Sequence, residues 1–359
     1  MSYVFDLSSL GYGSSEETAF EPHGAAGLAA GRIGAHHRGG YVIFSELGEL
    51  HGVSPGRLRS APAGETPAVG DWVAFRPLEG GGALIEAVLP RRTSLRRGRR
   101  DLARDSHVAE EQVIAANVDV ALLAVDLSLA AGPRSLERYL AAAWDSGAEP
   151  VIVLTKLDLC DVVEERVAET ETIAIGVPVY AVSAATGEGV DALRGLLSGN
   201  RTAALLGPSG SGKSTLVNRL LGREAQATGA VRSDGRGRHT TTARELFLVP
   251  GGGLLLDTPG LRILQLWEED GLGGAFSDVE ELAVRCRFSD CWHETEPGCA
   301  VREAVSSGVL DAGRLESFGK LARELAYLER KGDKRAEAEE RRRWRAMTKE
   351  ARARARPRR

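Results

Sequence analysis

The chain has 359 residues, of which 43% are hydrophobic and 27% are charged, and its formal net charge is −4. Its 43 Gly and 14 Pro are too few for a fibrous or wholly disordered protein. No apolar run approaches the roughly 20 residues that span a bilayer, and the opening MSYVFDLSSL lacks a signal-peptide pattern. We therefore expect a soluble, cytoplasmic, monomeric protein of two or three domains with no membrane partner.

Charged residues are unevenly distributed. Only six of the 46 basic residues are Lys, and Lys156 and Lys213 are the only two before residue 320. Residues 331–359 hold 13 basic and 5 acidic side chains, a net charge of +8. The near-neutral total therefore combines an acidic body with a basic tail.

The first hundred residues divide into two parts. Residues 1–32, rich in Gly, Ser and Glu, are predicted to be a partly ordered leader. Short apolar or alternating stretches between Gly and Pro predict a small all-β barrel over residues 33–100, with strands near 41–47, 71–78 and 83–89. The dense basic segment 91–104 is interpreted as the exit from the barrel into a polar connector.

The pattern changes in residues 112–275. VDVALLAVDL (118–127) and EPVIVLTKLDL (149–159) are typical of strands buried on both faces of a parallel sheet, and residues 135–144 between them have helical spacing. Further apolar runs predict strands at 177–184, 202–209, 243–250 and 252–260. This section is predicted to be a doubly wound α/β domain.

A phosphate-binding loop is predicted between the strand TAALL and the helical TLVNRLLG. Its sequence is Gly207-Pro208-Ser209-Gly210-Ser211-Gly212-Lys213-Ser214-Thr215, which matches G-x-x-x-x-G-K-[ST]. Glycines let backbone N–H groups turn toward phosphates at a helix N-terminus, where the helix dipole favours anions. Lys213 would reach the β- and γ-phosphates, and the Ser214 hydroxyl would bind Mg²⁺.

Two further segments complete the predicted catalytic and magnesium site. Asp257-Thr258-Pro259-Gly260 follows an apolar strand, so Asp257 would hold Mg²⁺ through water and the Gly260 N–H would meet the γ-phosphate. The loop 229–243 ends in three threonines, and we select Thr241 as the residue that would bind Mg²⁺ only while the γ-phosphate is present.

The bound base is predicted from Thr155-Lys156-Leu157-Asp158. This segment resembles the N-K-x-D motif of GTPases, in which the Asp accepts hydrogen bonds from guanine and the Lys stem lies against the ring. Thr155 replaces the usual Asn, so a bridging amide contact is expected to be missing or altered. Ser183-Ala184 resembles the short motif whose backbone reads the guanine oxygen. Because 155–184 precedes 207–214, the GTPase motifs are in circularly permuted order.

A cysteine and histidine cluster follows in residues 276–330. Cys286, Cys291, His293 and Cys299 supply three thiolates and an imidazole within fourteen residues, enough for one closed tetrahedral zinc site. No position would be left for water, so the predicted zinc is structural.

Together these segments resemble the ribosome small-subunit-dependent GTPase A family of bacterial circularly permuted GTPases. The resemblance covers about residues 33 to 325 and includes EQVIAANVD (111–119), TKLD, GPSGSGKST, GRHTTT (237–242), DTPGLR (257–262) and CRFSDCWHETEPGCAVREAV (286–305). It implies an α/β, circularly permuted P-loop GTPase domain between an N-terminal OB-fold barrel and a C-terminal zinc-binding helical domain. It also implies binding of GTP and GDP, hydrolysis stimulated by the small ribosomal subunit, and a role in late maturation of that subunit.

One catalytic position departs from the common GTPase pattern. Leu261 follows Gly260 where most GTPases have a Gln that orients the attacking water, and an apolar side chain cannot do this. Trp267 is followed by Glu268, whereas some family members have a His there. We select His239, beside the threonines, as the residue that would orient the attacking water instead. The alternative is that His239 has a structural role.

The predicted partner is the small-subunit rRNA. The basic segment 91–104 and the tail 331–359, which combines Arg with Trp344, are candidate RNA contacts, although a solvated charged surface would have the same composition. Two other functions stay open: a non-enzymatic GTP-gated RNA-binding checkpoint, and a P-loop ATPase or kinase acting on RNA.

Overall fold

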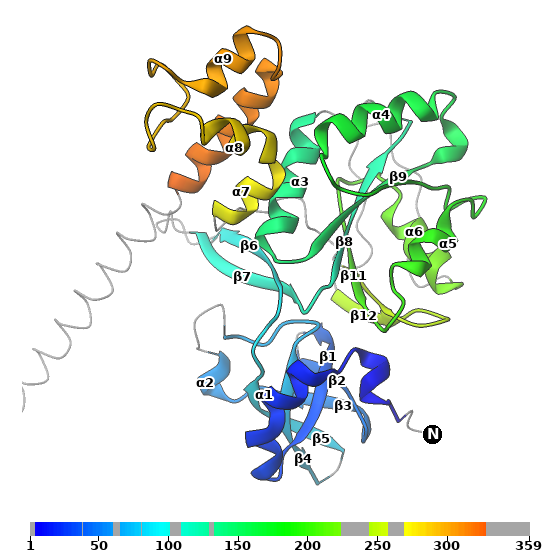
Figure 1. Cartoon of the computed structure of the whole chain (residues 1–359). Coiled ribbons are helices and arrows are strands. Elements are labelled where there is room, and N and C mark those ends of the chain that lie inside the picture. The colour runs from blue at the N-terminus through cyan, green and yellow to red at the C-terminus, as the bar shows by residue number, and fades with distance from the viewer. Residues whose placement is uncertain are drawn as a thin grey trace, which may run out of the picture.

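The computed structural model describes residues 4–37, 39–59, 65–79, 81–100, 109–128, 133–223, 244–257 and 269–327. The predicted basic tail, 331–359, and the part of the basic segment at 101–104 lie outside these residues. Figure 1 shows three folded parts, with the N-terminal barrel at the bottom, the α/β domain at the right and a helical module at the upper left. Among the described residues, no helix combines the length and hydropathy needed to cross a membrane.

The N-terminal part is a closed five-stranded barrel. Its strands pair in the order β1-β2-β3-β5-β4, and β1 also pairs with β4, which closes the ring. Ile33, Ile43, Trp72 and Phe75 are at most 1% exposed and fill the interior. The elements are η1 (Leu7–Leu10), α1 (Ser14–Ala25), β1 (Ala29–His37), β2 (Gly40–Ser45), β3 (Gly48–Val53), α2 (Gly56–Arg59), β4 (Trp72–Leu78) and β5 (Gly82–Val88). The predicted barrel is confirmed, and β1 begins within the segment 1–32 that was assigned to the leader.

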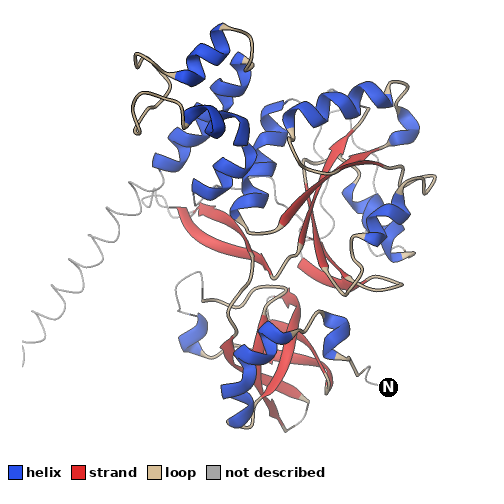
Figure 2. Cartoon of the chain, viewed as in Figure 1, coloured by secondary structure: helices blue, strands red, loops and turns tan. Residues whose placement is uncertain are grey.

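The central part is the predicted α/β sheet. Its strands lie in the order β10-β9-β8-β11-β13-β12, and every neighbouring pair is parallel except β12 with β13. Helices cover both faces: Leu122 of β8 packs with α5 and α6, whereas Leu123 packs with α3. The sheet strands are β8 (Val120–Asp126), β9 (Glu149–Thr155), β10 (Val179–Ala181), β11 (Thr202–Leu206), β12 (Arg244–Leu248) and β13 (Leu254–Asp257). The helices are α3 (Pro133–Asp145), η2 (Leu157–Leu159), α4 (Val163–Ile173), α5 (Val190–Gly195) and α6 (Lys213–Leu221). Figure 2 shows the red strands between the blue helices.

The barrel and the sheet are joined by backbone pairing. Strand β12 pairs antiparallel with β1, with Glu245 opposite Ala35 and Arg244 opposite His36. The strands of the barrel and of the α/β domain therefore form one hydrogen-bonded sheet of eleven strands.

The basic segment at the end of the barrel contains a strand. Strand β6 (Ser94–Arg100) pairs antiparallel with β7 (Ala109–Ala116) in a separate two-stranded ribbon. Its sequence lacks apolar alternation, so the sequence predicts no strand over these residues. Arg91 and Arg92, just before the ribbon, are held in ion pairs within the protein: Arg91 with buried Asp71, and Arg92 with Glu16 and Asp119. Arg92 therefore connects α1 to the start of the α/β domain, whereas the ion pair of Arg91 lies within the barrel.

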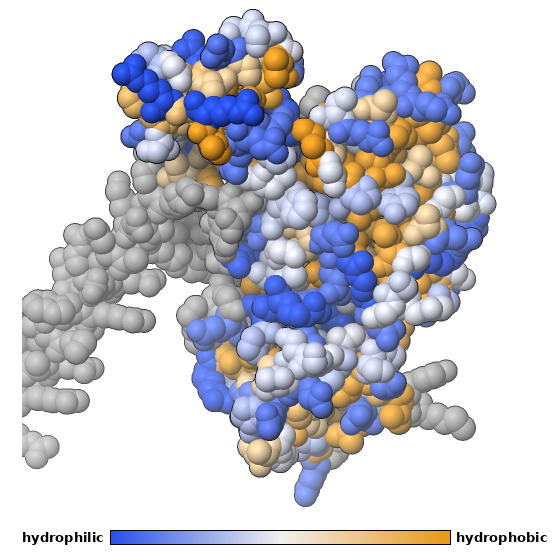
Figure 3. Space-filling view, in the orientation of Figure 1, coloured by the Kyte–Doolittle hydropathy of each residue, from blue (hydrophilic) through white to orange (hydrophobic). Residues whose placement is uncertain are grey.

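A buried arginine connects the N-terminal segment, the barrel and the start of the α/β domain. Arg32 is 1% exposed and donates to the backbone oxygens of Leu10, Gly70 and Asn117. Burial lowers the pKa of Arg32 to about 10, so the side chain stays protonated at neutral pH. Hydrophilic residues also line the visible junction between barrel and sheet in Figure 3.

The C-terminal module packs against α3. It comprises α7 (Glu269–Ala275), α8 (Ser277–Ala283), α9 (Ala300–Ser306) and a helix over 312–327. Arg314 is 7% exposed and lies 3.1 Å from Glu137 Oε1 of α3 and 2.8 Å from Asp278 Oδ2 of α8. A Cβ at Gly271 would lie 2.6 Å from the Ala141 carbonyl oxygen, so glycine lets α7 approach the α3 backbone. Ion pairs and close helix packing thus hold the module on the α/β domain.

Candidate functional site

The predicted phosphate loop connects β11 to α6. All five residues of β11 are buried, and α6 begins at Lys213 with Gly212 at its N-cap in the left-handed conformation. Gly207 has a φ of 140°, and a Cβ there would lie 2.4 Å from the Ala124 carbonyl oxygen of β8. A larger residue would push the loop away from the sheet, so glycine at this position lets the phosphate loop pass close to β8.

Lys213 lies across this loop. Its Nζ atom donates to the carbonyl oxygens of Gly207, at 2.8 Å, and Pro208, at 2.6 Å. Ser214 and Thr215 occupy the first turn of α6, half-buried and exposed respectively. The loop therefore presents an ammonium and hydroxyls at a helix N-terminus, which is chemistry suited to phosphates and a hard cation.

Thr155 joins the predicted base-reading segment to the phosphate loop. Thr155 is 2% exposed, and its hydroxyl lies 2.9 Å from the Ser211 carbonyl oxygen and 3.1 Å from that of Val125. The Thr155 hydroxyl therefore connects the base-reading segment to the phosphate loop in this chain.

The remaining residues of the base-reading segment lie on the turn after β9. The Leu157 N–H donates to the Val182 oxygen at 3.1 Å, which fixes this turn against the end of β10. Buried Ser183 donates from its hydroxyl to Asp158 Oδ1 at 2.5 Å, whereas Asp158 itself is exposed. Half-buried Ala184 follows Ser183. The structure thus brings the Asp158 carboxylate and the Ser183-Ala184 turn together.

Asp126 is a residue of this site that the sequence analysis did not select. It ends β8, and its Oδ2 atom lies 2.5 Å from the Nζ atom of Lys156. Like Asp257, it is an Asp at the end of an apolar run. This shared pattern could have identified Asp126 from the sequence as a candidate site residue.

Asp257 ends β13 on the other side of β11. It is 9% exposed, and β11 lies between β13 and β8 in the sheet. Because parallel strands end at the same edge, Asp257 and the phosphate loop share the edge where nucleotides bind in such sheets. The predicted residues Thr241, His239 and Gly260 lie outside the described residues, as do Leu261, Trp267 and Glu268. Their roles stay predictions.

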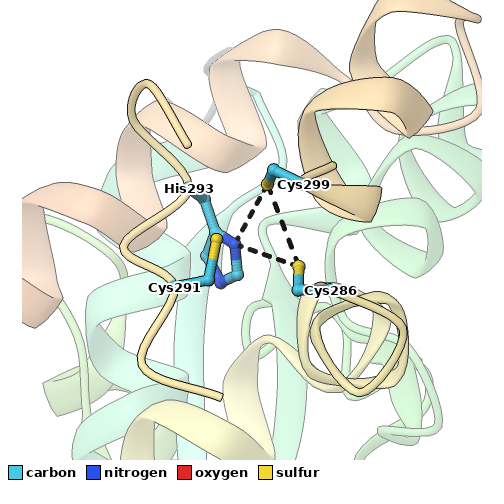
Figure 4. Close-up of side chains that lie close together, drawn as sticks. All are labelled: Cys286, Cys291, His293 and Cys299. Carbon is cyan, nitrogen blue, oxygen red and sulfur yellow. Dashed lines mark hydrogen bonds between the residues drawn. The ribbon is translucent and has the colours of Figure 1, made fainter. Parts of the chain in front are cut away.

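The predicted zinc ligands converge in the C-terminal module. Cys286 follows α8, Cys291 and His293 lie in the loop, and Cys299 is the N-cap of α9. Their ligand atoms all lie within 4.8 Å of one another. In Figure 4 the four side chains point toward a common centre.

The distances within this cluster fit a tetrahedral metal site. Cys286 Sγ lies 3.9 Å from Cys299 Sγ and 3.7 Å from His293 Nδ1, and the latter lies 3.4 Å from Cys299 Sγ. Zn–S bonds of about 2.3 Å in a tetrahedron place sulfurs about 3.8 Å apart. His293 has a φ of 60°, so the chain bends to aim its ring at the thiols. Three soft sulfurs and one imidazole suit zinc.

Comparisons with known proteins agree with this geometry. The family model described as RsgA GTPase matches residues 88–267. The chain is 44% identical over 356 residues to the small ribosomal subunit biogenesis GTPase RsgA of Streptomyces avermitilis, covering 96% of this chain and 92% of that protein. It is also 44% identical over 331 residues to the protein of that name from Xanthomonas axonopodis pv. citri, covering 89% and 88%.

Solved structures show the same architecture. The crystal structure of YjeQ from Thermotoga maritima is similar with a TM-score of 0.62 and 29% identity, covering 83% of this chain and 99% of that one. The structure of YloQ, described as a circularly permuted GTPase, is similar with a TM-score of 0.58 and 25% identity, covering 83% and 95%. The permuted order predicted from the motifs is thus matched in a solved structure.

Proposed function

The chain belongs to the RsgA GTPase family, and from this membership we propose that it hydrolyses GTP to GDP and phosphate while docked on the small ribosomal subunit. In this proposal the protein acts in the cytoplasm, in the late maturation of that subunit. Two relatives that are matched over most of their length are named as GTPases of small-subunit biogenesis, which supports the proposal.

One observation carries the proposed nucleotide chemistry. Thr155, Ser183, the phosphate loop and Asp257 all lie at the carboxyl edge of one parallel sheet, although they occur in permuted order along the chain. That edge is where doubly wound sheets bind nucleotides. The arrangement supplies a phosphate cradle, a carboxylate for guanine and a second carboxylate for a metal ion.

Individual roles follow from chemistry and position. Lys213 and the loop backbone would bind the phosphates, and Asp158 would accept hydrogen bonds from guanine. The Ser214 hydroxyl and the Asp257 carboxylate are hard oxygen ligands, which fit Mg²⁺. When bound, Mg²⁺ would neutralise charge on the phosphates.

Dependence on the subunit follows from the residue after Gly260. Leu261 cannot orient water, so hydrolysis by the isolated chain would be slow. The partner, or a residue that docking brings into place, would supply the missing group. We assign His239 as the chain's own candidate because it lies beside the threonines of the predicted switch.

The four-ligand cluster is proposed to hold one structural zinc ion. Its four donors would close the coordination shell, so the metal would stabilise the module rather than act in hydrolysis. Helix α7 of that module begins twelve residues after Asp257 and packs on α3. We therefore propose that hydrolysis of the nucleotide repositions the module through the short segment between Asp257 and α7.

Turnover measurements test the proposal. We expect GTP hydrolysis by the full chain to rise strongly when purified small subunits are added, with no comparable ATP hydrolysis. Asp158→Ala should lower guanine selectivity, and Lys213→Ala should abolish nucleotide-dependent binding to subunits. Asp161→Ala, an exposed carboxylate in the same loop, is the matched control.

The outcomes separate the alternatives. Turnover that subunits do not change would contradict activation on the ribosome. GTP-dependent subunit binding without hydrolysis would support a non-enzymatic checkpoint protein. Preference for ATP would indicate an RNA-directed ATPase or kinase.

A further inference from the structure

We propose that Asp126 is a positioning residue for nucleotide binding, which holds the ammonium of Lys156 so that the aliphatic stem is fixed beside the base. This inference rests on the proposed guanine-nucleotide site. It adds a residue outside every motif on which that site was predicted.

The β ladder places the two side chains together. Asp126 is the ladder partner of Thr155, and the Leu127 N–H donates to the Thr155 oxygen at 3.0 Å. Lys156 comes one residue later, with a φ of 62° that turns the chain at the end of the strand. Its Nζ atom lies 2.5 Å from Asp126 Oδ2.

A second set of hydrogen bonds fixes the carboxylate itself. The Ser128 N–H and hydroxyl donate to Asp126 Oδ1 at 3.0 and 2.6 Å, which leaves Oδ2 for the lysine. Burial raises the pKa of Asp126, but the hydrogen bonds from Lys156 and Ser128 outweigh it and lower the pKa below its usual value. Asp126 is therefore ionised at neutral pH, and its charge is available to Lys156.

The Asp126–Lys156 pair lies between the two parts of the proposed nucleotide site. Strand β8 is the neighbour of β11 on one side and of β9 on the other, so Asp126 lies between the phosphate loop and the base-reading turn. Two residues before Asp126, the backbone of β8 comes close to the phosphate loop, because a Cβ at Gly207 would lie 2.4 Å from the Ala124 oxygen.

The ion pair with Asp126 also reduces the conformational entropy that Lys156 loses when the nucleotide binds. A lysine with an unpaired ammonium samples many rotamers, and a ligand that uses its stem must stop this motion. The Asp126 contact restricts Lys156 before the ligand arrives, so more of the contact energy appears as affinity. The expected signature is faster nucleotide release when the pair is broken, with little change in association.

A double-mutant cycle tests this role. We would prepare Asp126→Asn, Lys156→Met, the double variant and Glu149→Gln, and measure N-methylanthraniloyl-GDP binding and release by stopped flow. Glu149 is the matched control, because it forms an ion pair with Arg201, also at 2.5 Å, at the opposite end of β9. Thermal melting of each apo variant would show that it is folded.

If the proposal is correct, the losses of GDP affinity in the two single variants do not add up in the double variant. Asp126→Asn should weaken GDP binding about tenfold through faster release, and the double variant should bind no worse than Lys156→Met. Glu149→Gln should bind like the wild type. Ser128→Ala, which keeps the carboxylate but removes one donor, should lose about twofold to threefold and provides a milder test.

Two results would overturn the role of Asp126. One is wild-type affinity in Asp126→Asn. The other is multiplication of the two single losses in the double variant, since Asp126 would then act independently of Lys156. A wild-type chain that prefers ATP would instead contradict the guanine assignment, and the same cycle could be measured with the labelled adenine nucleotide.

Discussion

The Thr155 hydroxyl lies 2.9 Å from the carbonyl oxygen of Ser211, a residue 56 positions later in the chain. This contact joins the turn that carries Lys156 and Asp158 to the loop that carries Lys213. Because both residues are buried, the base-reading and phosphate-binding parts of the site share one rigid support.

Removing this hydroxyl should weaken nucleotide binding. Thr155→Val keeps the side-chain shape but leaves the Ser211 oxygen without this donor, at a cost of about 1–3 kcal/mol. We expect GDP affinity to fall about fivefold to tenfold in equilibrium fluorescence titrations. Thr172→Val is the control, because the Thr172 hydroxyl makes a similar bond to the Glu169 oxygen on the exposed helix α4. Equal affinities in the two variants would contradict the bridging role.

The phosphate loop could be placed between a strand and a helix from the sequence, because its glycines and Lys213 have a fixed local spacing and Lys213 begins α6. The contact that requires glycine at 207 could not be predicted from this spacing, because it is made with Ala124 of β8. Asp126 was missed because its role depends on the pairing of β8 with β9, which brings Lys156 within reach.

Strand β1 shows why part of the fold could not be predicted. It has glycines at two buried positions, because a Cβ at Gly31 would lie 2.5 Å from Ile43 Cγ2 and one at Gly34 would lie 2.4 Å from a Phe44 ring atom. Residues on a neighbouring strand therefore determine the composition of β1. Ribbon strand β6 is likewise defined by its pairing with β7 rather than by its own pattern.

The cysteine cluster should bind close to one equivalent of zinc. Metal analysis of the intact protein should find this amount, and Cys299→Ser should lower it below half an equivalent, because a serine hydroxyl does not ionise to replace a thiolate. Cys160→Ser should keep the metal, since Cys160 is outside the four-residue cluster. Clearly less than one equivalent in the intact wild-type chain would count against the zinc assignment.

The module should detach more easily when its buried ion pair is broken. Arg314→Ala leaves Glu137 and Asp278 without their cation, and loss of one partner of a buried pair costs about 3–5 kcal/mol. Urea unfolding should therefore show a lower midpoint or an early transition for the C-terminal module. Arg323→Ala, whose pair with Glu294 is more than half exposed on both side chains, should change stability by at most about 1 kcal/mol. Matching unfolding curves for both variants would show that the pair does not hold the module.

Arg32 should be essential for the junction between the N-terminal segment, the barrel and the α/β domain. Its guanidinium donates to three backbone oxygens, those of Leu10, Gly70 and Asn117, and its carbon atom Cζ lies 5.4 Å from the Trp72 ring centroid. Arg32→Met keeps an apolar chain of similar length but leaves the Leu10 and Asn117 oxygens without this donor, whereas the Gly70 oxygen still accepts from Asn117 Nδ2 at 3.2 Å. Because each such unpaired acceptor costs about 1–3 kcal/mol, we expect a loss of at least about 2 kcal/mol in the free energy of unfolding.

An exposed arginine of the same barrel provides the comparison for Arg32. Arg57 pairs with Glu86 at 2.8 Å, but its side chain is 64% exposed, so Arg57→Met should change stability by less than about 1 kcal/mol. Chemical unfolding followed by tryptophan fluorescence would measure both, because Trp72 is buried beside Arg32 and reports on the barrel. If Arg32→Met unfolded at the wild-type midpoint, the three carbonyl contacts would contribute no net stability, and the junction would have to depend on the Arg92 ion pairs with Glu16 and Asp119.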